Sequence, residues 1–271
     1  MKVKLNNSSY THTFVICAYG ECIYLEECIK SIFNQSISSK VIMVTSTNNK
    51  YIKDMCKRYN IKLYVRKGKS DIQRDWNFGY NCTDSDLVTL VHQDDIYEEK
   101  YLYNVLNYYN RYDDIYFVCT DYYVLKDGIK CSDLNSKLKK VLKFFLRFSI
   151  FNKMKFFKVM SLSFGNSICC PSVTYNKKML GNDNIFTSKL KFSLDWDTFI
   201  KIAKMKGRIG YISKKLLCYR IHEDATTMKY VVDKSKRYEE DMYCFLQIWP
   251  KWFARIILRF YEKASGTYEK K

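Results

Sequence analysis

The chain has 271 residues, of which 47% are apolar, so it can bury the core of one large domain and is not a disordered chain. No segment holds the roughly 18–20 apolar residues that cross a bilayer, and the start lacks the apolar run of a signal peptide, which together predict a cytoplasmic protein. The net charge of +18 indicates an anionic partner, such as nucleotide phosphates or an acidic membrane face. No nucleic-acid-binding motif occurs, so nucleic acid is not an expected partner.

The eleven cysteines are irregularly spaced, odd in number and free of any CxxC pair, and the chain has only three histidines. Several cysteines lie inside apolar runs, where the thiol acts as a small hydrophobic group. This pattern favours reduced structural thiols over a disulfide framework or a zinc site.

The first half of the chain alternates continuous apolar runs, which are typical of strands buried on both faces, with amphipathic stretches at helical spacing. The predicted strands cover 14–18, 41–44, 61–65, 86–91 and 115–119, and the predicted helices cover 24–35, 49–59, 71–81 and 98–110. This alternation predicts an α/β fold with a mostly parallel central sheet flanked by helices. In such sheets, ligands bind beyond the carboxyl ends of the strands.

The alternation stops after the fifth predicted strand. We expect a helix over 195–206 that ends at Gly207, a hairpin-like stretch over 208–221, and a basic amphipathic helical tail over 229–271. Neither an internal repeat nor a linker rich in Pro, Gly or Ser is present, so residues 1–228 are expected to form one catalytic unit.

Two adjacent carboxylates, Asp94 and Asp95, follow the predicted strand 86–91 within the sequence HQDDIY. Two ionised groups side by side are costly unless a cation lies nearby, and hard oxygen ligands suit Mn²⁺ or Mg²⁺. The alternative is that the pair caps a following helix. A Walker-B site is excluded because the chain has no GxxxxGK[ST] loop.

Four motifs, in order, resemble family-2 glycosyltransferases over roughly residues 13–227. They are FVICAYGECIYLEECIKSIFNQS, RDWNFGYN, DLVTLVHQDDIY and the pair LDWDTF and YRIHED. The acidic motif matches the subgroup with HQDD in place of DxDD, which resembles bacterial polysaccharide and rhamnosyl-type transferases. The resemblance implies a GT-A fold, with donor binding in 13–120 and the acceptor and the catalytic base in 121–228.

The resemblance also implies roles for individual residues. The donor would contact Ala18, Tyr19, Glu21, Thr45, Ser46, Asp75, Trp76, Asn77, His92, Gln93, Asp94 and Arg220. The divalent metal, Mn²⁺ or Mg²⁺, would be held by Asp95, Asp94 and His222. Where the family usually has an acidic DDGS that contacts the nucleotide base, this chain has Thr45-Ser46-Thr47. The expected donor is a UDP- or dTDP-linked sugar, and these residues do not determine which base it carries.

Asp195 aligns with the family's catalytic base, although Leu194 replaces the usual Glu. A carboxylate there would take the proton of the acceptor hydroxyl during a single, inverting displacement. The residues alone leave open that Asp195 and Asp197 only charge the start of the predicted helix. For His222 and Arg220, a structural histidine and a surface salt bridge to Glu223 or Asp224 stay as alternatives.

Two basic amphipathic stretches are rich in aromatic residues. In 137–148 the predicted apolar face is Leu138, Val141, Leu142, Phe145 and Phe148, and the basic face is Lys139, Lys140, Lys143 and Arg147. After Pro250, the apolar stripe is Trp252, Phe253, Ile256, Ile257 and Phe260, opposite Lys251, Arg255 and Arg259. Such helices either lie on an anionic membrane surface or pack on the catalytic domain.

Taken together, the sequence predicts an inverting, metal-dependent glycosyltransferase that moves a hexosyl or deoxyhexosyl group to a saccharide or lipid-linked acceptor. Synthesis of a surface polysaccharide, peripheral to the inner face of the cell membrane, is the expected setting. Two alternatives stay open: a nucleotidyltransferase that makes a nucleotide-sugar, and a non-catalytic basic module that docks on membranes. The first would need a Gly-rich phosphate loop near the first strand, which ICAYGE lacks.

Overall fold

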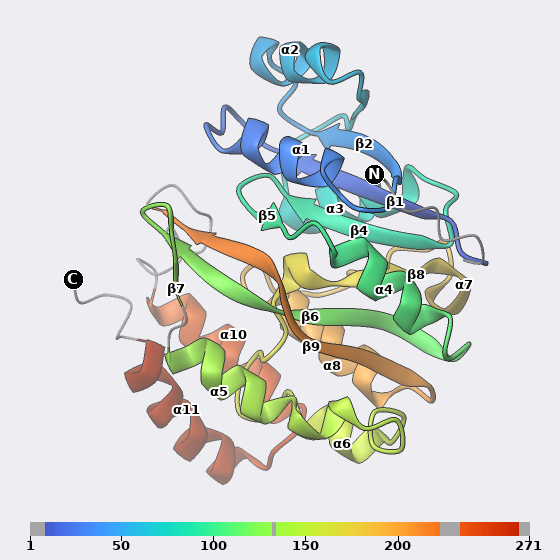
Figure 1. Ribbon diagram of the computed structural model, residues 1–271. Helices are drawn as coiled ribbons and strands as arrows, with labels where there is room; N and C mark the ends of the chain where they lie inside the picture. Colours follow the sequence, from blue (N-terminus) through green and yellow to red (C-terminus); the bar gives the residue numbers. More distant parts are fainter. Residues whose placement is uncertain (1–8, 132–133, 223–233, 266–271) are drawn as a thin grey trace.

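The computed structural model describes residues 9–131, 134–222 and 234–265. Its strands are β1 His12–Ala18, β2 Lys40–Thr45, β3 Lys62–Val65, β4 Leu87–His92, β5 Ile96–Tyr97, β6 Ile115–Lys126, β7 Ile129–Cys131, β8 Thr174–Asn176 and β9 Arg208–Ile221. Among the described residues these strands form one sheet in the order β3-β2-β1-β4-β8-β6-β9-β5, with β7 paired to β6 (Figure 1).

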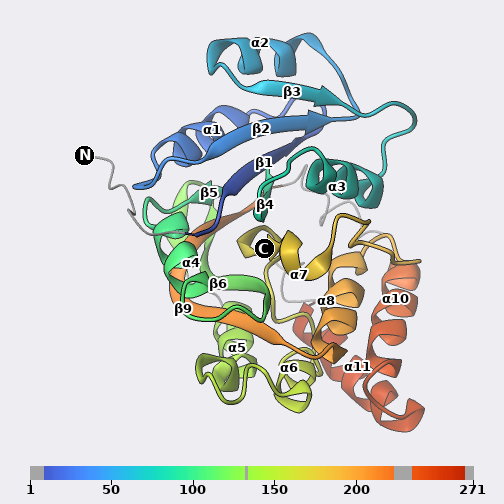
Figure 2. The same ribbon diagram turned by 90° about the vertical axis from the view of Figure 1, so that its right-hand side faces the viewer.

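The helices are α1 Leu25–Phe33, α2 Lys50–Arg58, α3 Ile72–Asn81, α4 Tyr101–Tyr109, α5 Leu134–Leu142, α6 Lys155–Met160, α7 Lys177–Leu180, α8 Leu194–Lys204, α10 Lys234–Leu246 and α11 Lys251–Ser265. Two short 3-10 helices, η1 Phe144–Arg147 and η2 Cys170–Ser172, complete the described elements. The mixture of sheet and flanking helices confirms the predicted α/β class (Figures 1 and 2).

The predicted parallel arrangement is present from β3 to β4 and again between β6 and β9. The pairings of β8 with β4 and β6, of β5 with β9 and of β7 with β6 are antiparallel, so the sheet is mixed. Strand β1 is buried on both faces: Phe14 and Ile16 join the core with α1, and Val15 joins the core with α3. At Gly79 of α3 an added Cβ would lie 3.0 Å from Val15, so glycine allows this close approach.

The hairpin-like stretch expected at 208–221 is wrong: these residues form the single strand β9. Strand β9 runs parallel to β6 for nearly all of its length, with register shifts around Thr120 to Tyr122. Lys214 and Lys215, which resemble a turn in the sequence, fall where the register shifts. The long partner strand therefore stabilises an extended conformation that the local sequence does not indicate.

Helices α5, α6 and α11 lie together at the lower end of the molecule in both views (Figures 1 and 2). Helix α11 packs through Ala254, Ile257 and Leu258, which are buried in the same core as Cys244 and Phe245 of α10. Across the described ranges, no helix is both long and apolar enough to cross a membrane. Part of the predicted tail, residues 229–233 and 266–271, lies outside the described residues.

Candidate functional site

The carboxyl ends of β1, β2 and β4 lie side by side and are tied together by side chains. The amide of Gln93, directly after β4, pairs with the backbone of Tyr19: its Oε1 accepts from the Tyr19 N–H at 2.8 Å and its Nε2 donates to the Tyr19 carbonyl at 2.9 Å. The N–H of Gly20 donates to Oγ1 of Thr47 at 2.7 Å, which joins the loops after β1 and β2. These bonds fix the strand-end loops where ligands are expected.

Asp95 is a buried carboxylate with one satisfied oxygen and one that is not. Its Oδ1 accepts a hydrogen bond from the backbone N–H of Arg220 at 2.9 Å, whereas its buried Oδ2 has no protein partner. Burial, and then the neighbouring charge of Asp94, raise the pKa of Asp95 well above its ordinary value. An orphaned buried carboxylate oxygen is costly unless something binds it.

The neighbouring carboxyl, Asp94, has a pKa shifted in the opposite direction to that of Asp95. Its Oδ2 is 3.0 Å from Nε2 of His222. Burial alone would raise the pKa of Asp94, but the hydrogen bond with His222 helps to bring that pKa below its ordinary value. The pKa values of the two adjacent carboxyls are therefore shifted in opposite directions, as expected for interacting groups.

Strand β9 brings Arg220 back to the acidic pair from the far part of the chain. The Arg220 Nε donates to the Asp94 carbonyl at 2.9 Å, and its terminal nitrogen forms an ion pair with Glu27 of α1. The guanidinium also lies 4.1 Å from the ring centroid of Tyr24. Arg220 is thus a buried clamp on the loop that carries the acidic pair. The alternative partners Glu223 and Asp224 lie outside the described residues.

His92, the last residue of β4, is the second polar group at this edge that lacks a partner. Its ring stacks on Trp76 of α3 with centroids 5.2 Å apart, and its Nε2 is buried without a hydrogen bond. Burial lowers the pKa of His92, which favours the neutral imidazole. A neutral imidazole nitrogen can act as a metal ligand.

The geometry of this edge fits a divalent cation. One potential ligand atom each from His92, Asp94 and Asp95 lies within 4.8 Å of the others. Two of these residues each carry a buried polar atom without a protein partner among the described residues, Asp95 Oδ2 and His92 Nε2. Carboxylates and an imidazole can bind Mn²⁺ with room for phosphate oxygens. The helix-cap alternative does not hold, because Ile96–Tyr97 form strand β5 rather than a helix.

The predicted donor-binding residues of β2 and α3 form a second polar group. Ser46 donates to Oδ2 of Asp75 at 2.8 Å, and Arg66 pairs with the other oxygen of Asp75 at 2.6 Å. Asn77 is placed differently: its amide bonds in both directions with the backbone of Phe186, so it holds a loop. The other predicted contacts lie along the strand ends, with Ala18 and Thr45 buried and Tyr19 and Glu21 exposed.

Asp195 lies in the first turn of α8, and both of its oxygens accept hydrogen bonds. Oδ2 accepts from the Asn166 side chain at 2.8 Å, and Oδ1 accepts from the N–H of Trp196 at 2.8 Å. Burial raises the pKa of Asp195 to about 6, and these two hydrogen bonds limit the rise. Asp197 differs, because it is fully buried and pairs with Lys201 and Gln247. Of these two aspartates, Asp195 is the one that has no ion-pair partner among the described residues and has a pKa raised toward neutrality, which suits a general base.

The buried Cys169 thiol is influenced by the charges of both Asp95 and Asp195. Burial raises the pKa of Cys169, and the charges of Asp95 and Asp195 each raise it further. The structure thus brings residues 94–95 and 220–222 together through the contacts of Arg220 and His222 with the acidic pair, whereas Asp195 is held separately by Asn166.

Three supporting residues are missing from the sequence-based predictions. Asn166 holds Asp195, whereas Glu27 and Tyr24 hold Arg220. Glu27 and Tyr24 lie within the predicted first helix, where acidic residues are explained by the helix dipole alone. Asn166 lies in FGNS, a stretch with no periodicity, and only its contact with Asp195 reveals its role.

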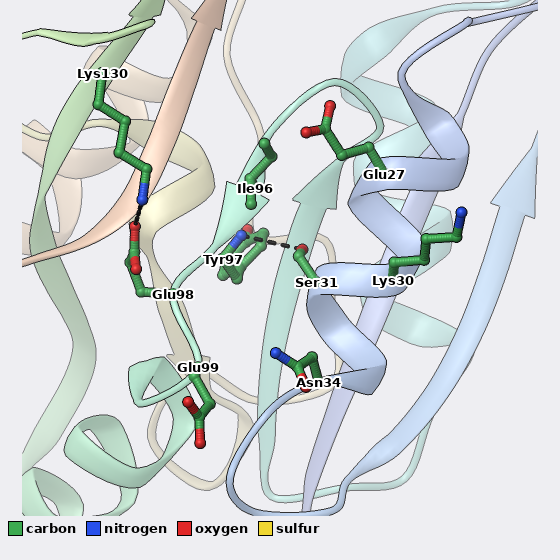
Figure 3. Close-up of a pocket in the computed structure, with 9 residues that line it drawn as sticks. All are labelled: Glu27, Lys30, Ser31, Asn34, Ile96, Tyr97, Glu98, Glu99 and Lys130. Atoms are coloured by element: carbon green, nitrogen blue, oxygen red, sulfur yellow. Dashed lines mark hydrogen bonds and ion pairs between the residues drawn. The ribbon is translucent and has the colours of Figure 1, made fainter. Parts of the chain in front are cut away.

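A cavity of about 640 Å³ lies between α1 and the strand that follows the acidic pair. Figure 3 shows Glu27 and Lys30 of α1, with Asn34 directly after the helix, along one side, and Glu98 and Lys130, joined by an ion pair, on the other. None of the predicted donor contacts is among its nine labelled lining residues. The cavity therefore lies beside the predicted donor site and is distinct from it.

Comparisons with known proteins agree with this geometry. The sequence model described as "Glycosyl transferase family 2" matches residues 13–213, about three quarters of the chain. The chain is 22% identical over 245 residues to the minor teichoic acid biosynthesis protein GgaB of Bacillus subtilis (strain 168). That match covers 86% of this chain but 26% of GgaB, so the chain spans about a quarter of this relative's length.

Solved structures with a similar fold include two nucleotide-sugar complexes. Residues 1–349 of TarS from S. aureus, in complex with UDP-GlcNAc, match with a TM-score of 0.62 and 15% identity, over 92% of this chain and 70% of that one. The mannosyltransferase PcManGT from Pyrobaculum calidifontis, in complex with GDP-Man and Mn²⁺, matches with a TM-score of 0.60 and 15% identity, over 93% of this chain and 69% of that one. These matches confirm the predicted GT-A fold.

Proposed function

The chain belongs to glycosyl transferase family 2 and is a glycosyltransferase, and on that premise we propose that it acts by an inverting, metal-dependent displacement. The observation that carries the proposal is the buried, unpartnered Oδ2 of Asp95 next to Asp94 and His92. Family membership sets aside the nucleotidyltransferase and the non-catalytic module. We also propose the division into a donor part over 13–120, an acceptor part over 121–228 and a tail over 229–271.

Asp95 and Asp94 would hold Mn²⁺ or Mg²⁺, with His92 and His222 as the nearest imidazoles. Such an ion offsets the charge that develops on the diphosphate of the departing nucleotide. Arg220, clamped between Glu27 and the Asp94 carbonyl, keeps this loop in place and adds positive charge beside it. Trp76 would support the donor from the side of α3, where its ring stacks on His92.

Asp195 would be the general base. The acceptor hydroxyl transfers its proton to an Asp195 oxygen while the hydroxyl oxygen bonds to the anomeric carbon. The bond from that carbon to the diphosphate breaks on the opposite side, and the nucleoside diphosphate leaves with the electron pair. Asn166 orients the carboxylate during this step. A single displacement of this kind inverts the anomeric configuration.

For the donor we propose a UDP- or dTDP-linked sugar, and for the acceptor a saccharide or a lipid-linked glycan in the synthesis of a surface polysaccharide. Two relatives support this class, since one is named for teichoic acid biosynthesis and another was solved with UDP-GlcNAc. A lipid-linked acceptor would place the enzyme at the inner face of the cell membrane.

A thermal-shift screen of nucleotide-sugars with and without Mn²⁺ tests the proposal. We expect the melting temperature to rise for one nucleotide class, and only with the metal present, because binding to the folded state alone stabilises it. The Asp95→Asn variant should not respond. A metal-independent rise of the same size in both proteins would contradict the metal assignment.

A further inference from the structure

The segment around η1 turns apolar side chains outward. Six phenylalanines contact one another ring to ring, with centroids between 4.4 and 6.0 Å apart. We call this group the aromatic patch: Phe144, Phe145, Phe148, Phe151, Phe156 and Phe157. Phe156 is 64% exposed and the neighbouring Ile150 is 59% exposed. Leu138 and Val141, on the predicted apolar face of this stretch, are also more than half exposed.

A buried ion pair fixes this outward orientation. Lys143, predicted to lie on the solvated basic face, is instead buried and pairs with Asp121 of β6 at 3.0 Å. The hydroxyl of Tyr211 on β9 donates to the other oxygen of Asp121 at 2.7 Å. Because breaking a buried ion pair is costly, the segment cannot simply roll its apolar face inward. The inward-facing lysine and the outward-facing phenylalanines are two results of the same orientation.

In the sequence, all charged residues near the aromatic patch are basic. No Asp or Glu occurs between residues 134 and 182. The exposed basic residues of this segment are Lys137, Lys140, Arg147, Lys153 and Lys155. Exposed aromatic rings with a basic border are typical of surfaces that enter the interface of an anionic bilayer.

Helix α11 adds a second apolar strip at the same end of the molecule (Figures 1 and 2). Trp252, Ile256 and Phe260 are exposed on its outer side, with Trp252 at 66%. Arg255 and Arg259 are exposed beside them. The stripe predicted from the sequence is therefore split, because Ile257 packs inward whereas these three residues face solvent.

We propose that the aromatic patch and the outer side of α11 dock together on a bilayer that contains anionic lipids. A two-fold contact with a second copy is less suited, because it would oppose one basic border to another. Anionic headgroups complement the border, and the acyl region accepts the rings. The inference rests on the proposed function for its purpose, since docking would hold the enzyme at the membrane that carries a lipid-linked acceptor.

Flotation with lipid vesicles, without donor or metal, tests the docking. The wild-type protein should float with vesicles of 70% phosphatidylcholine and 30% phosphatidylglycerol and stay unbound with phosphatidylcholine alone. Two variants, Ile150→Ser/Phe156→Ser and Lys153→Glu/Lys155→Glu, should each reduce the bound fraction at least tenfold. All four side chains are exposed, so folding should be preserved, as checked by circular dichroism. The matched control, Val65→Ser/Ile129→Ser, removes exposed apolar groups of β3 and β7, outside both the aromatic patch and α11, and should bind vesicles normally.

The outcomes separate this proposal from the proposed function. Wild-type protein that hydrolyses a nucleotide-sugar but does not float overturns only the docking. Equal flotation of the patch variants and the wild type also overturns it. If analytical ultracentrifugation instead shows a dimer that Ile150→Ser/Phe156→Ser dissociates, the patch is a contact between copies and the proposal is wrong. If the wild-type protein binds vesicles but does not hydrolyse a nucleotide-sugar, the docking proposal stands and the catalytic assignment is contradicted.

Discussion

Asp95 is buried and Asp195 is half-buried, and burial raises the pKa of both carboxyls, but their oxygens have different surroundings. Asp95 keeps one oxygen without a partner and has a second carboxyl beside it. Both oxygens of Asp195 accept hydrogen bonds, and no acidic side chain is among the groups that shift its pKa.

The difference matches two chemical tasks. A carboxyl that is both desolvated and next to another carboxyl is unfavourable as an anion, so it gains most from a bound cation. A carboxyl whose pKa lies near 6 and whose oxygens are oriented can accept a proton and release it again. Substitutions that affect one task but not the other will test this division.

The largest effect is expected for Asp95→Asn. The amide keeps the shape of the side chain but removes the charge that binds the cation, so turnover should fall about 10⁴-fold, equivalent to several kcal/mol of electrostatic stabilisation. Without metal, the variant should be at least as stable as the wild type, because a neutral group replaces a carboxyl in an unfavourable position. Calorimetric titration with Mn²⁺ and thermal unfolding measure both effects. Normal Mn²⁺ affinity in the variant would contradict the assignment.

Asp195→Asn should leave donor binding unchanged and reduce transfer by about 10³-fold, since a positioned general base contributes roughly 10²–10⁴. Steady-state kinetics would show the loss in kcat, with the donor KM near the wild-type value. The matched control is Asp197→Asn, in the same helical turn, whose carboxylate pairs with Lys201. The control should lower stability but keep turnover per folded molecule. Equal losses of kcat in both variants would make Asp195 a structural residue.

The strands on the proposed donor side can be predicted from the sequence because their signals are local. Strand β1 is buried on both faces, so it appears as a continuous apolar run, and Asp94 and Asp95 follow the similar run of β4 directly. The register between neighbouring strands, and the sheet edge at which their carboxyl ends lie, then follow from the rules for parallel sheets. Cys17 of β1 pairs with His92 in the sheet, as this reasoning requires.

The other half depends on contacts that a sequence pattern does not encode. Amphipathicity in 137–148 shows that two faces exist but not which one packs inward, and the partner of Lys143 lies on β6. Similarly, the extended conformation of β9 depends on its pairing with β6, a strand far away in the sequence, and not on a local preference of Lys214 and Lys215. Asn166 is recognisable only once α8 lies beside it.

The smallest expected effect concerns pH and isolates the role of Asn166. A base must be deprotonated, so kcat should fall as the pH drops below about 6, the pKa of Asp195. The hydrogen bond from Asn166 favours the charged carboxylate and lowers this pKa, so Asn166→Ala should raise it and move the acidic limb about one pH unit upward. At high pH the rate should fall only a few-fold.

Gln247→Ala is the matched control, because Gln247 donates an equivalent hydrogen bond to Asp197 at 2.8 Å. Its acidic limb should stay at the wild-type pH. A shift in both variants would mean that general loosening of α8, and not the bond from Asn166, moves the profile. A shift in Asn166→Ala but not in Gln247→Ala, together with loss of the acidic limb in Asp195→Asn, would assign the ionisation to Asp195. The acidic pair would then be excluded as its source, since the hydrogen bond from Asn166 goes to Asp195.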